Sequence, residues 1–158
     1  MLHDAGAKLD LSPEKVSHCI KEVNFGFMFA PLHHQAMKNV AASRKEIAPN
    51  KTIFNMLGPI TNPANAQIQL IGVFDQSTMH LVADSLMELG TSKAMVLNSR
   101  DGMDEASIYA ETDIIEIRDK VKTQYTINPK DYGITGKNLE TLKTRNEKSS
   151  LDFIFSVI

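Results

Sequence analysis

The feature that most constrains the fold is a strand, helix, strand pattern over residues 68–98. The apolar run 68–74 predicts a strand, and Asp75 is a candidate N-cap for a helix whose apolar residues recur at helical spacing until Gly90. The apolar run 93–98 predicts a second strand. Two strands joined by a helix are typical of a parallel pair, so the pattern favours an α/β fold with a central, mixed, partly parallel sheet flanked by helices.

Shorter segments with alternating polarity follow at residues 108–110, 113–118 and 121–127, and an Asn128-Pro129 turn closes them. Alternation is typical of strands with one exposed face, so these segments predict an antiparallel edge region of the same sheet. A polar stretch begins at Gly136, and the apolar residues of 151–158 predict a final amphipathic helix.

Near the start, Ser12-Pro13-Glu14 combines an N-cap, a first-position proline and a first-turn acid, which predicts a helix. Cys19 lies on the apolar side of that helix, where packing explains a cysteine better than nucleophilic chemistry. With 158 residues and 42% hydrophobic content, the chain is long enough for one domain with a real core. We therefore expect a single α/β domain over residues 1–158.

Composition excludes several classes of protein. Seventeen basic and 19 acidic residues give a net charge of −2, with no basic run that could follow a nucleic-acid backbone. One cysteine permits no internal disulfide. No apolar run approaches the roughly 20 residues that cross a bilayer, and the first ten residues do not have the order of a signal peptide. The expectations are a cytoplasmic location and no nucleic-acid or membrane partner.

Residues 25–63 crowd apolar, basic and turn-forming side chains together. The run Phe25–Phe29 predicts a buried strand that ends at Ala30-Pro31, because proline disfavours further ladder bonding. Beyond it, His34, Met37, Ala41 and Arg44 follow at steps of three, four and three, so on a continuous helix they share one face.

Two further segments could be shaped for a ligand. Gly58-Pro59 and Asn62-Pro63 predict two turns within an apolar stretch, where Asn55 is expected to hydrogen-bond its own loop backbone. Asp101, Asp104 and Glu105 follow the predicted strand 93–98, and ligands of open α/β sheets gather beyond the carboxyl ends of strands. Adjacent carboxylates suit a Mg²⁺ ion that also binds phosphate, although a solvated acidic turn has the same composition.

The segments FGFMFAPLHHQAMKNVAASRKEI and TIFNMLGPITNPA, together with Gln69–Val73 and the acidic segment 101–105, resemble anthranilate phosphoribosyltransferase. The resemblance extends to about Gly133 and is poor over residues 136–158. The family's helical domain and its glycine-rich phosphate loop have no counterpart in this sequence, so the chain resembles the C-terminal α/β portion of that enzyme, in truncated form.

The resemblance implies a fold of the nucleoside phosphorylase and phosphoribosyltransferase type, and the transfer of a phosphoribosyl group from phosphoribosyl pyrophosphate to anthranilate in tryptophan biosynthesis. It implies that Arg44 binds the anthranilate carboxylate and that Pro31, His34 and Met37 line the anthranilate channel. It assigns Mg²⁺ to Asp104 and Glu105, and no catalytic residue to this chain. Homodimers in the family form mainly through the helical domain. Without the phosphate loop, this isolated chain is expected to be inactive.

Two alternatives remain open from the sequence. A pyrimidine nucleoside phosphorylase belongs to the same fold group, but the motif FNMLGPITNP favours the transferase. A non-catalytic α/β module that acts only through interactions is favoured by the lack of a phosphate loop.

Overall fold

The computed structural model describes residues 2–33, 39, 45–47, 52–136, 140, 143–144 and 146–157. The chain divides into two compact units, one formed by Met1–Asn50 with Glu140–Ile158 and the other by Lys51–Leu139. The expectation of a single α/β domain over residues 1–158 stays a prediction.

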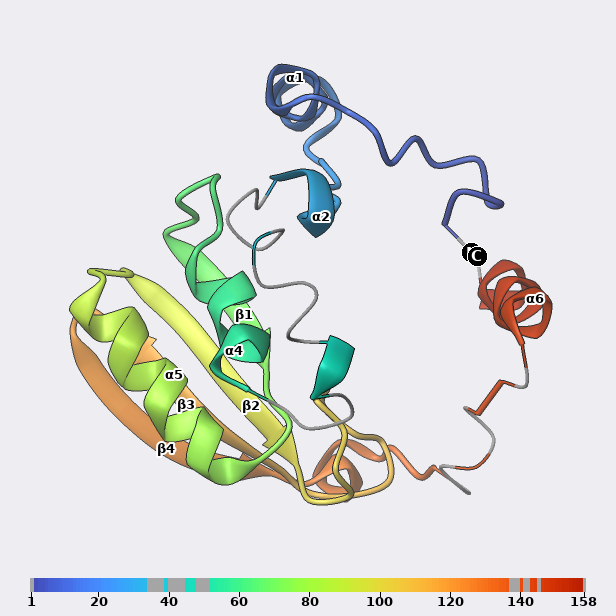
Figure 1. Cartoon of the computed structure of the whole chain (residues 1–158). Helices are drawn as coiled ribbons and strands as arrows, with labels where there is room; N and C mark the ends of the chain where they lie inside the picture. Colours follow the sequence, from blue (N-terminus) through green and yellow to red (C-terminus); the bar gives the residue numbers. More distant parts are fainter. Residues whose placement is uncertain are drawn as a thin grey trace. The chain divides into compact units, whose positions relative to one another are not determined.

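The second unit is built on a four-stranded mixed sheet (Figure 1). Its strands are β1 (Ile68–Gly72), β2 (Lys93–Ser99), β3 (Thr112–Arg118) and β4 (Val121–Ile127), and they lie in that order across the sheet. β1 pairs with β2 in parallel, whereas β2–β3 and β3–β4 are antiparallel. The predicted α/β class and the predicted mixed sheet are confirmed.

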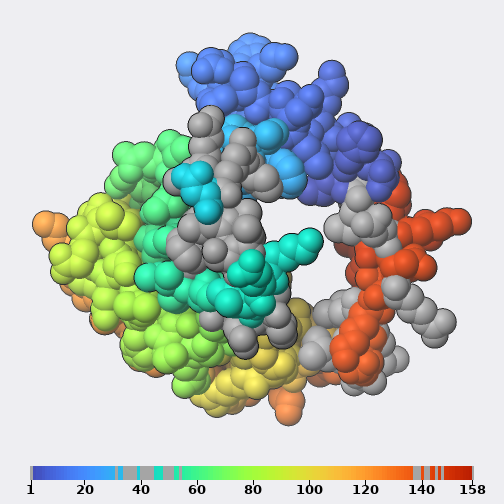
Figure 2. All heavy atoms as spheres, viewed as in Figure 1, coloured from blue at the N-terminus to red at the C-terminus, as the bar shows by residue number. Residues whose placement is uncertain are grey.

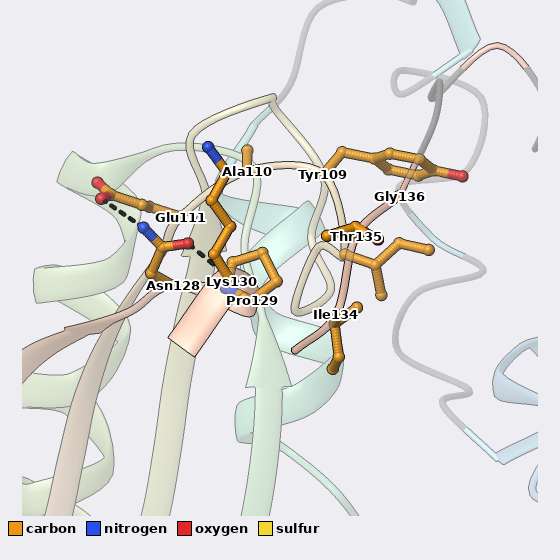
Figure 3. Close-up of a pocket in the computed structure, with 10 residues that line it drawn as sticks. Tyr109, Ala110, Glu111, Asn128, Pro129, Lys130, Ile134, Thr135 and Gly136 are labelled. Atoms are coloured by element: carbon orange, nitrogen blue, oxygen red, sulfur yellow. Dashed lines mark hydrogen bonds between the residues drawn. The ribbon is translucent and has the colours of Figure 1, made fainter. Parts of the chain in front are cut away.

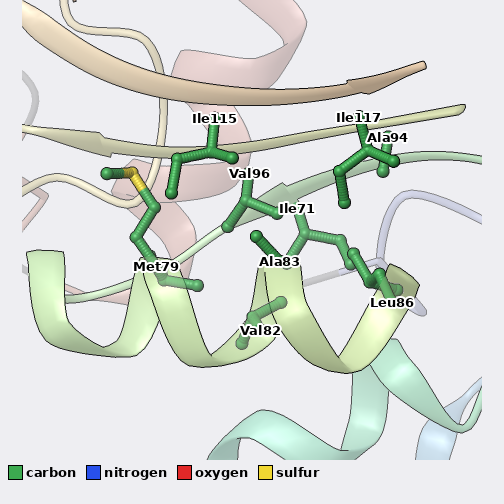
Figure 4. Packing of buried hydrophobic residues seen from close by; sticks show 10 residues of the cluster. Ile71, Met79, Val82, Ala83, Leu86, Ala94, Val96, Ile115 and Ile117 are labelled. Atoms are coloured by element: carbon green, nitrogen blue, oxygen red, sulfur yellow. The ribbon is translucent and has the colours of Figure 1, made fainter. Parts of the chain in front are cut away.

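Helix α5 (Gln76–Glu88) connects the two parallel strands and covers one face of the sheet. The register places Ile71 opposite Val96, and Val96 opposite Ile115, so these three side chains share the face toward α5. Figure 4 shows the helix and strand side chains packed against one another. The buried cluster consists of Ile71, Val73, Met79, Val82, Ala83, Leu86, Ala94, Val96, Ile115 and Ile117. Burial of this apolar surface is the main stabilising term of the unit.

Both ends of α5 follow from local sequence chemistry. The Asp75 carboxylate accepts a hydrogen bond from the Thr78 N–H at 2.7 Å, as an N-cap should. Gly90 lies in the left-handed region with φ of 78°, which a residue without Cβ adopts at little cost. The predicted start and end of this helix are confirmed.

The segment that precedes the sheet forms helix α4 (Ile53–Ile60), so the turn predicted at Gly58-Pro59 is wrong. Proline lies in the last turn of α4, where its fixed φ is already helical and the missing N–H interrupts only one hydrogen bond. At the start of α4, the Asn55 side-chain oxygen accepts a hydrogen bond from the Thr52 N–H at 2.9 Å, which confirms the structural role predicted for Asn55. A turn does form at Asn62, whose carbonyl accepts from the Asn65 N–H.

The region between β2 and β4 differs from the sequence prediction in one place. Residues 108–110 form bends and no strand. The Ser107 hydroxyl accepts hydrogen bonds from the N–H groups of Tyr109 and Ala110, and this local turn replaces strand pairing there. After β4, Asn128 caps a 3₁₀ helix, η2 (Pro129–Tyr132), at the predicted turn.

The first unit contains α1 (Pro13–Val23), α2 (Ala30–His33) and α6 (Glu147–Val157). The helix predicted to start at Ser12-Pro13 is confirmed as α1, and the predicted final helix is confirmed as α6. The Ser12 side chain caps α1 by accepting a hydrogen bond from the Lys15 N–H. Cys19 is half-buried and not a full core residue. Across the part of the chain that the structure describes, no helix is both long and apolar enough to cross a membrane.

The strand predicted at Phe25–Phe29 is not formed. The segment follows α1, and Gly26 packs so closely on it that an added Cβ would lie 2.7 Å from Ile20 Cγ1. Phe25 is 69% exposed. A strand requires a partner with which to exchange backbone hydrogen bonds, and composition alone does not provide one.

Candidate functional site

The predicted metal-binding residues lie in the loop that joins β2 to β3, between Ser99 and Thr112. Asp104 and Glu105 are both exposed at the middle of this loop. The loop leaves the carboxyl end of β2, and its yellow to orange atoms lie at the surface in Figure 2. Carboxylates at this end of a parallel strand pair are well placed to meet a ligand from solvent.

The two carboxylates influence one another. Partial burial raises the pKa of Glu105, and the negative charge of Asp104 and a hydrogen bond between the two side chains raise it further. Two like charges held side by side favour the binding of a proton or a cation between them. The acidic pair is thus poised for a positively charged partner.

The chemistry of the acidic pair fits Mg²⁺ in part. Carboxylate oxygens are ligands of the kind that Mg²⁺ prefers, and this ion commonly uses one or two carboxylates together with phosphate and water. Among the residues that the structure describes, no group of three or more His, Cys, Asp or Glu side chains could hold a metal. Asp104 and Glu105 could therefore supply a minority of the ligands, with the others coming from elsewhere.

A hydrogen-bonded frame holds the loop on either side of the acidic pair. Asp101 accepts hydrogen bonds from the Ser107 hydroxyl at 2.6 Å and from the Met103 N–H at 3.3 Å. Burial acts to raise the pKa of Asp101, but the hydrogen bonds from Ser107, Ser99 and Met103 outweigh it and the pKa is lowered. These hydrogen bonds favour the charged form of Asp101 and hold its side chain within the loop.

A second polar cluster surrounds Asp113 in β3. Its carboxylate accepts hydrogen bonds from Gln76 at 2.7 Å, from Thr126 at 2.7 Å and from Arg100. The hydrogen bond from Arg100 lowers the pKa of Asp113, against the effect of burial. Because these partners come from α5, β4 and the start of the loop, the cluster ties these elements together.

A pocket of about 270 Å³ lies beside this cluster (Figure 3). Glu111 accepts a hydrogen bond from the Asn128 side chain at its rim, and the Tyr109 ring lies against Gly136. Asp104 and Glu105, the two predicted site residues whose side chains the structure describes, do not line it. The pocket is a separate feature from the acidic pair.

The predicted anthranilate-binding residues are less fully described. Pro31 belongs to α2, and its side chain lies outside the description. His34, Met37 and Arg44 fall outside the described residues, so the shared helix face predicted for them remains a prediction. Asp104 and Glu105 are the two predicted site residues that the structure brings together.

Two residues that contact the loop were not predicted from the sequence. Gly72 ends β1 directly beneath the Asp104 carbonyl, and Ser107 is buried at the far end of the loop. A glycine inside a strand pattern often marks the close approach of another backbone, so Gly72 carried a usable signal. No comparable signal in the sequence indicated Ser107, because its hydrogen bond with Asp101 forms only in the folded loop.

Comparison with known proteins places these observations in a family. The family model described as "Glycosyl transferase family, a/b domain" matches residues 1–158. The chain is 44% identical over 158 residues to the anthranilate phosphoribosyltransferase of Hydrogenovibrio crunogenus, and 46% identical over 154 residues to that of Ruthia magnifica. It covers 46% and 45% of these two relatives, so it spans somewhat less than half of their length.

Solved structures show the same fold. A variant of the Saccharomyces cerevisiae anthranilate phosphoribosyltransferase with Mg bound gives a TM-score of 0.83 at 21% identity, over 94% of this chain and 42% of that one. The same yeast enzyme in complex with PRPP and Mg gives a TM-score of 0.78 over 88% of this chain and 39% of that one. These comparisons confirm the resemblance predicted from the sequence, and the chain belongs to the glycosyl transferase family, of which it matches the α/β domain.

Proposed function

We propose that this chain supplies the anthranilate-binding and metal-binding α/β portion of an anthranilate phosphoribosyltransferase. The reaction transfers a phosphoribosyl group from phosphoribosyl pyrophosphate to the amine of anthranilate and releases pyrophosphate. The observation that carries the proposal is the pair Asp104 and Glu105, held side by side in the loop beyond β2 in a chain 44% identical throughout to relatives of that name.

In this proposal Asp104 and Glu105 provide the protein ligands of Mg²⁺, and the donor diphosphate and water provide the others. When bound, the ion neutralises charge that develops on the departing pyrophosphate. Burial and, after it, the negative charge of Asp104 raise the pKa of Glu105, and a bound cation would offset the repulsion between the two carboxylates.

Arg44 is proposed to bind the carboxylate of anthranilate through its planar guanidinium, which can form two parallel hydrogen bonds. Pro31, His34 and Met37 are proposed to line the channel that holds the ring. Fixing the acceptor in this way brings its amine to the sugar carbon, and orientation of two reactants is a large part of catalysis by such enzymes.

A glycine-rich phosphate loop is not among the 158 residues, so we expect the isolated chain to lack activity. Backbone N–H groups of such loops provide most contacts to a diphosphate. A cytoplasmic location is part of this proposal, and homodimers are expected of the family through the helical domain.

The test is a chimera in which the first half of the Hydrogenovibrio crunogenus relative precedes this chain. Our proposal predicts Mg²⁺-dependent formation of phosphoribosyl anthranilate from anthranilate and phosphoribosyl pyrophosphate. Phosphorolysis of uridine or thymidine instead would identify a pyrimidine nucleoside phosphorylase. A chimera that folds and catalyses neither reaction would favour a non-catalytic module.

A further inference from the structure

The loop that carries the acidic pair packs against the end of β1 at a point with no room for a side chain. A Cβ added to Gly72 would lie 1.5 Å from the Asp104 carbonyl oxygen and 2.6 Å from its carbonyl carbon. Gly72 does not adopt a positive φ, so space and not backbone conformation requires the glycine. Any larger residue would push the Asp104 backbone away from β1.

A second constraint acts on the loop from the other side. The Ser107 hydroxyl donates to Asp101 at 2.6 Å, while the Ser107 N–H donates to the Thr112 hydroxyl at 3.1 Å. Ser107 is 6% exposed, which excludes water as an equivalent partner. The Asp101–Ser107 hydrogen bond therefore closes a loop of five residues in which Asp104 and Glu105 are central.

The start of the loop is fixed by the backbone itself. The Ser99 N–H donates to the Met103 carbonyl at 2.9 Å, and the Gly102 N–H donates to the Ser99 carbonyl at 2.9 Å. Asp104 follows directly from this turn. The backbone that carries the exposed Asp104 carboxylate is therefore held at three places: by the Ser99–Met103 hydrogen bond, by the contact with Gly72 and by the Asp101–Ser107 hydrogen bond.

We propose that Gly72 and Ser107 are positioning residues that hold Asp104 and Glu105 side by side for a divalent cation. The inference rests on the proposed function, in which the acidic pair binds Mg²⁺. Two carboxylates repel one another in water, and a loop without these contacts would let the backbone of Asp104 and Glu105 move before a cation binds. A frame that keeps them together removes that ordering cost from cation binding.

The test uses Mn²⁺ as a paramagnetic substitute for Mg²⁺ on the 158-residue chain. Selective broadening of the Asp104 and Glu105 amide signals during a Mn²⁺ titration reports an apparent Kd without any measurement of activity. Ser107→Ala is the main variant, because it removes no carboxylate, and Gly72→Ala is the independent second variant. We expect each to raise the apparent Kd by at least about threefold, because Ser107→Ala removes the hydrogen bond that closes the loop and Gly72→Ala displaces the Asp104 backbone.

Matched controls separate positioning from a general loss of stability. Ser85→Ala removes a hydroxyl that donates to the Leu81 carbonyl on α5, and Gly58→Ala adds a Cβ that meets no atom within 4 Å. Both controls should keep the Mn²⁺ affinity of the parent. Faster amide exchange at Met103 and Tyr109 in Ser107→Ala would support the proposal independently, because both N–H groups depend on the frame.

Failure of this inference is distinguishable from failure of the proposed function. If Asp104→Asn with Glu105→Gln abolishes the broadening while Ser107→Ala and Gly72→Ala keep the affinity of the parent, the acidic pair binds the ion but the positioning proposal is overturned. If the parent shows no selective broadening, or the double variant keeps it, the metal assignment fails and the positioning proposal fails with it.

Discussion

The Asp113 carboxylate accepts two hydrogen bonds from the guanidinium of Arg100, at 3.1 Å from Nε and 2.9 Å from Nη2. Asp113 is 4% exposed, and Arg100 also pairs with Glu111 at the rim of the sheet. The pair joins the residue that follows β2 to the buried start of β3, an inner strand of the sheet. Its contribution to stability should therefore depend on pH.

The hydrogen bond from Arg100 holds the pKa of Asp113 below its ordinary value of 3.8, against the opposing effect of burial. Such a carboxyl stabilises the fold above its unfolded-state pKa, and the contribution is lost as pH falls through the folded-state pKa. We expect Asp113→Asn to lower the free energy of unfolding by about 1 to 3 kcal/mol at neutral pH. The difference in the free energy of unfolding between this variant and the parent should become smaller as pH falls below 3.8.

Urea unfolding near pH 7 and again below pH 3.8 measures this difference directly. Asp84→Asn is the matched control, because Asp84 pairs with Lys122 at the surface with 60% of its side chain exposed. Exposed pairs contribute little, so Asp84→Asn should change stability by less than about 1 kcal/mol. If the free energies of unfolding of Asp113→Asn and the parent differed by the same amount at both pH values, the role assigned to Asp113 would be contradicted.

Asp75 provides a prediction about the helix that covers the sheet. Its carboxylate caps α5 through the Thr78 N–H, so Asp75→Ala should destabilise the chain by about 1 kcal/mol in thermal or urea unfolding. Asp75→Ser keeps an oxygen at the N-cap and should recover most of that loss. Equal destabilisation by alanine and serine would show that the capping hydrogen bond is not the cause.

Arg44 provides a prediction about the acceptor substrate, measured in the chimera. Arg44→Ala should raise the KM for anthranilate far more than the KM for phosphoribosyl pyrophosphate. Loss of a charge-assisted hydrogen bond costs about 1.5 to 3 kcal/mol, and Arg44→Lys should recover part of it. Lys45→Ala removes the neighbouring positive charge and should leave both KM values near those of the parent. Equal effects of Arg44→Ala on both substrates would reject the assignment.

Much of the sheet unit could be predicted because its signals are local. Asp75 and Gly90 mark the ends of α5 through capping chemistry that involves only neighbouring residues. The alternating residues of β3 and β4 mark strands whose partners are adjacent in sequence. The parallel pairing of β1 and β2 followed from the length of the helix between them.

The remaining features depend on contacts between distant residues. Phe25–Phe29 has the composition of a strand but no strand partner in the described part of the chain. Pro59 favours a turn by composition, but it lies in the last turn of α4, where the helix already provides the φ that proline requires. The contact of Gly72 with the Asp104 carbonyl joins residues that lie on opposite sides of α5 in the sequence. The acidic pair could be predicted from the local sequence. The contacts of Gly72 and Ser107 that hold its loop could not, because they form only in the folded chain.

The most direct test of the account is the dependence of the chimera's rate on Mg²⁺ concentration. Asp104→Asn with Glu105→Gln should raise the Mg²⁺ concentration for half-maximal rate by at least about tenfold and should depress turnover, because both proposed ligands of the ion are weakened. The control Asp84→Asn with Glu88→Gln removes two exposed carboxylates of α5 and should behave as the parent. If the Asp104 and Glu105 double variant instead keeps the rate and Mg²⁺ dependence of the parent, the loop is only a solvated turn and the proposed metal site is wrong.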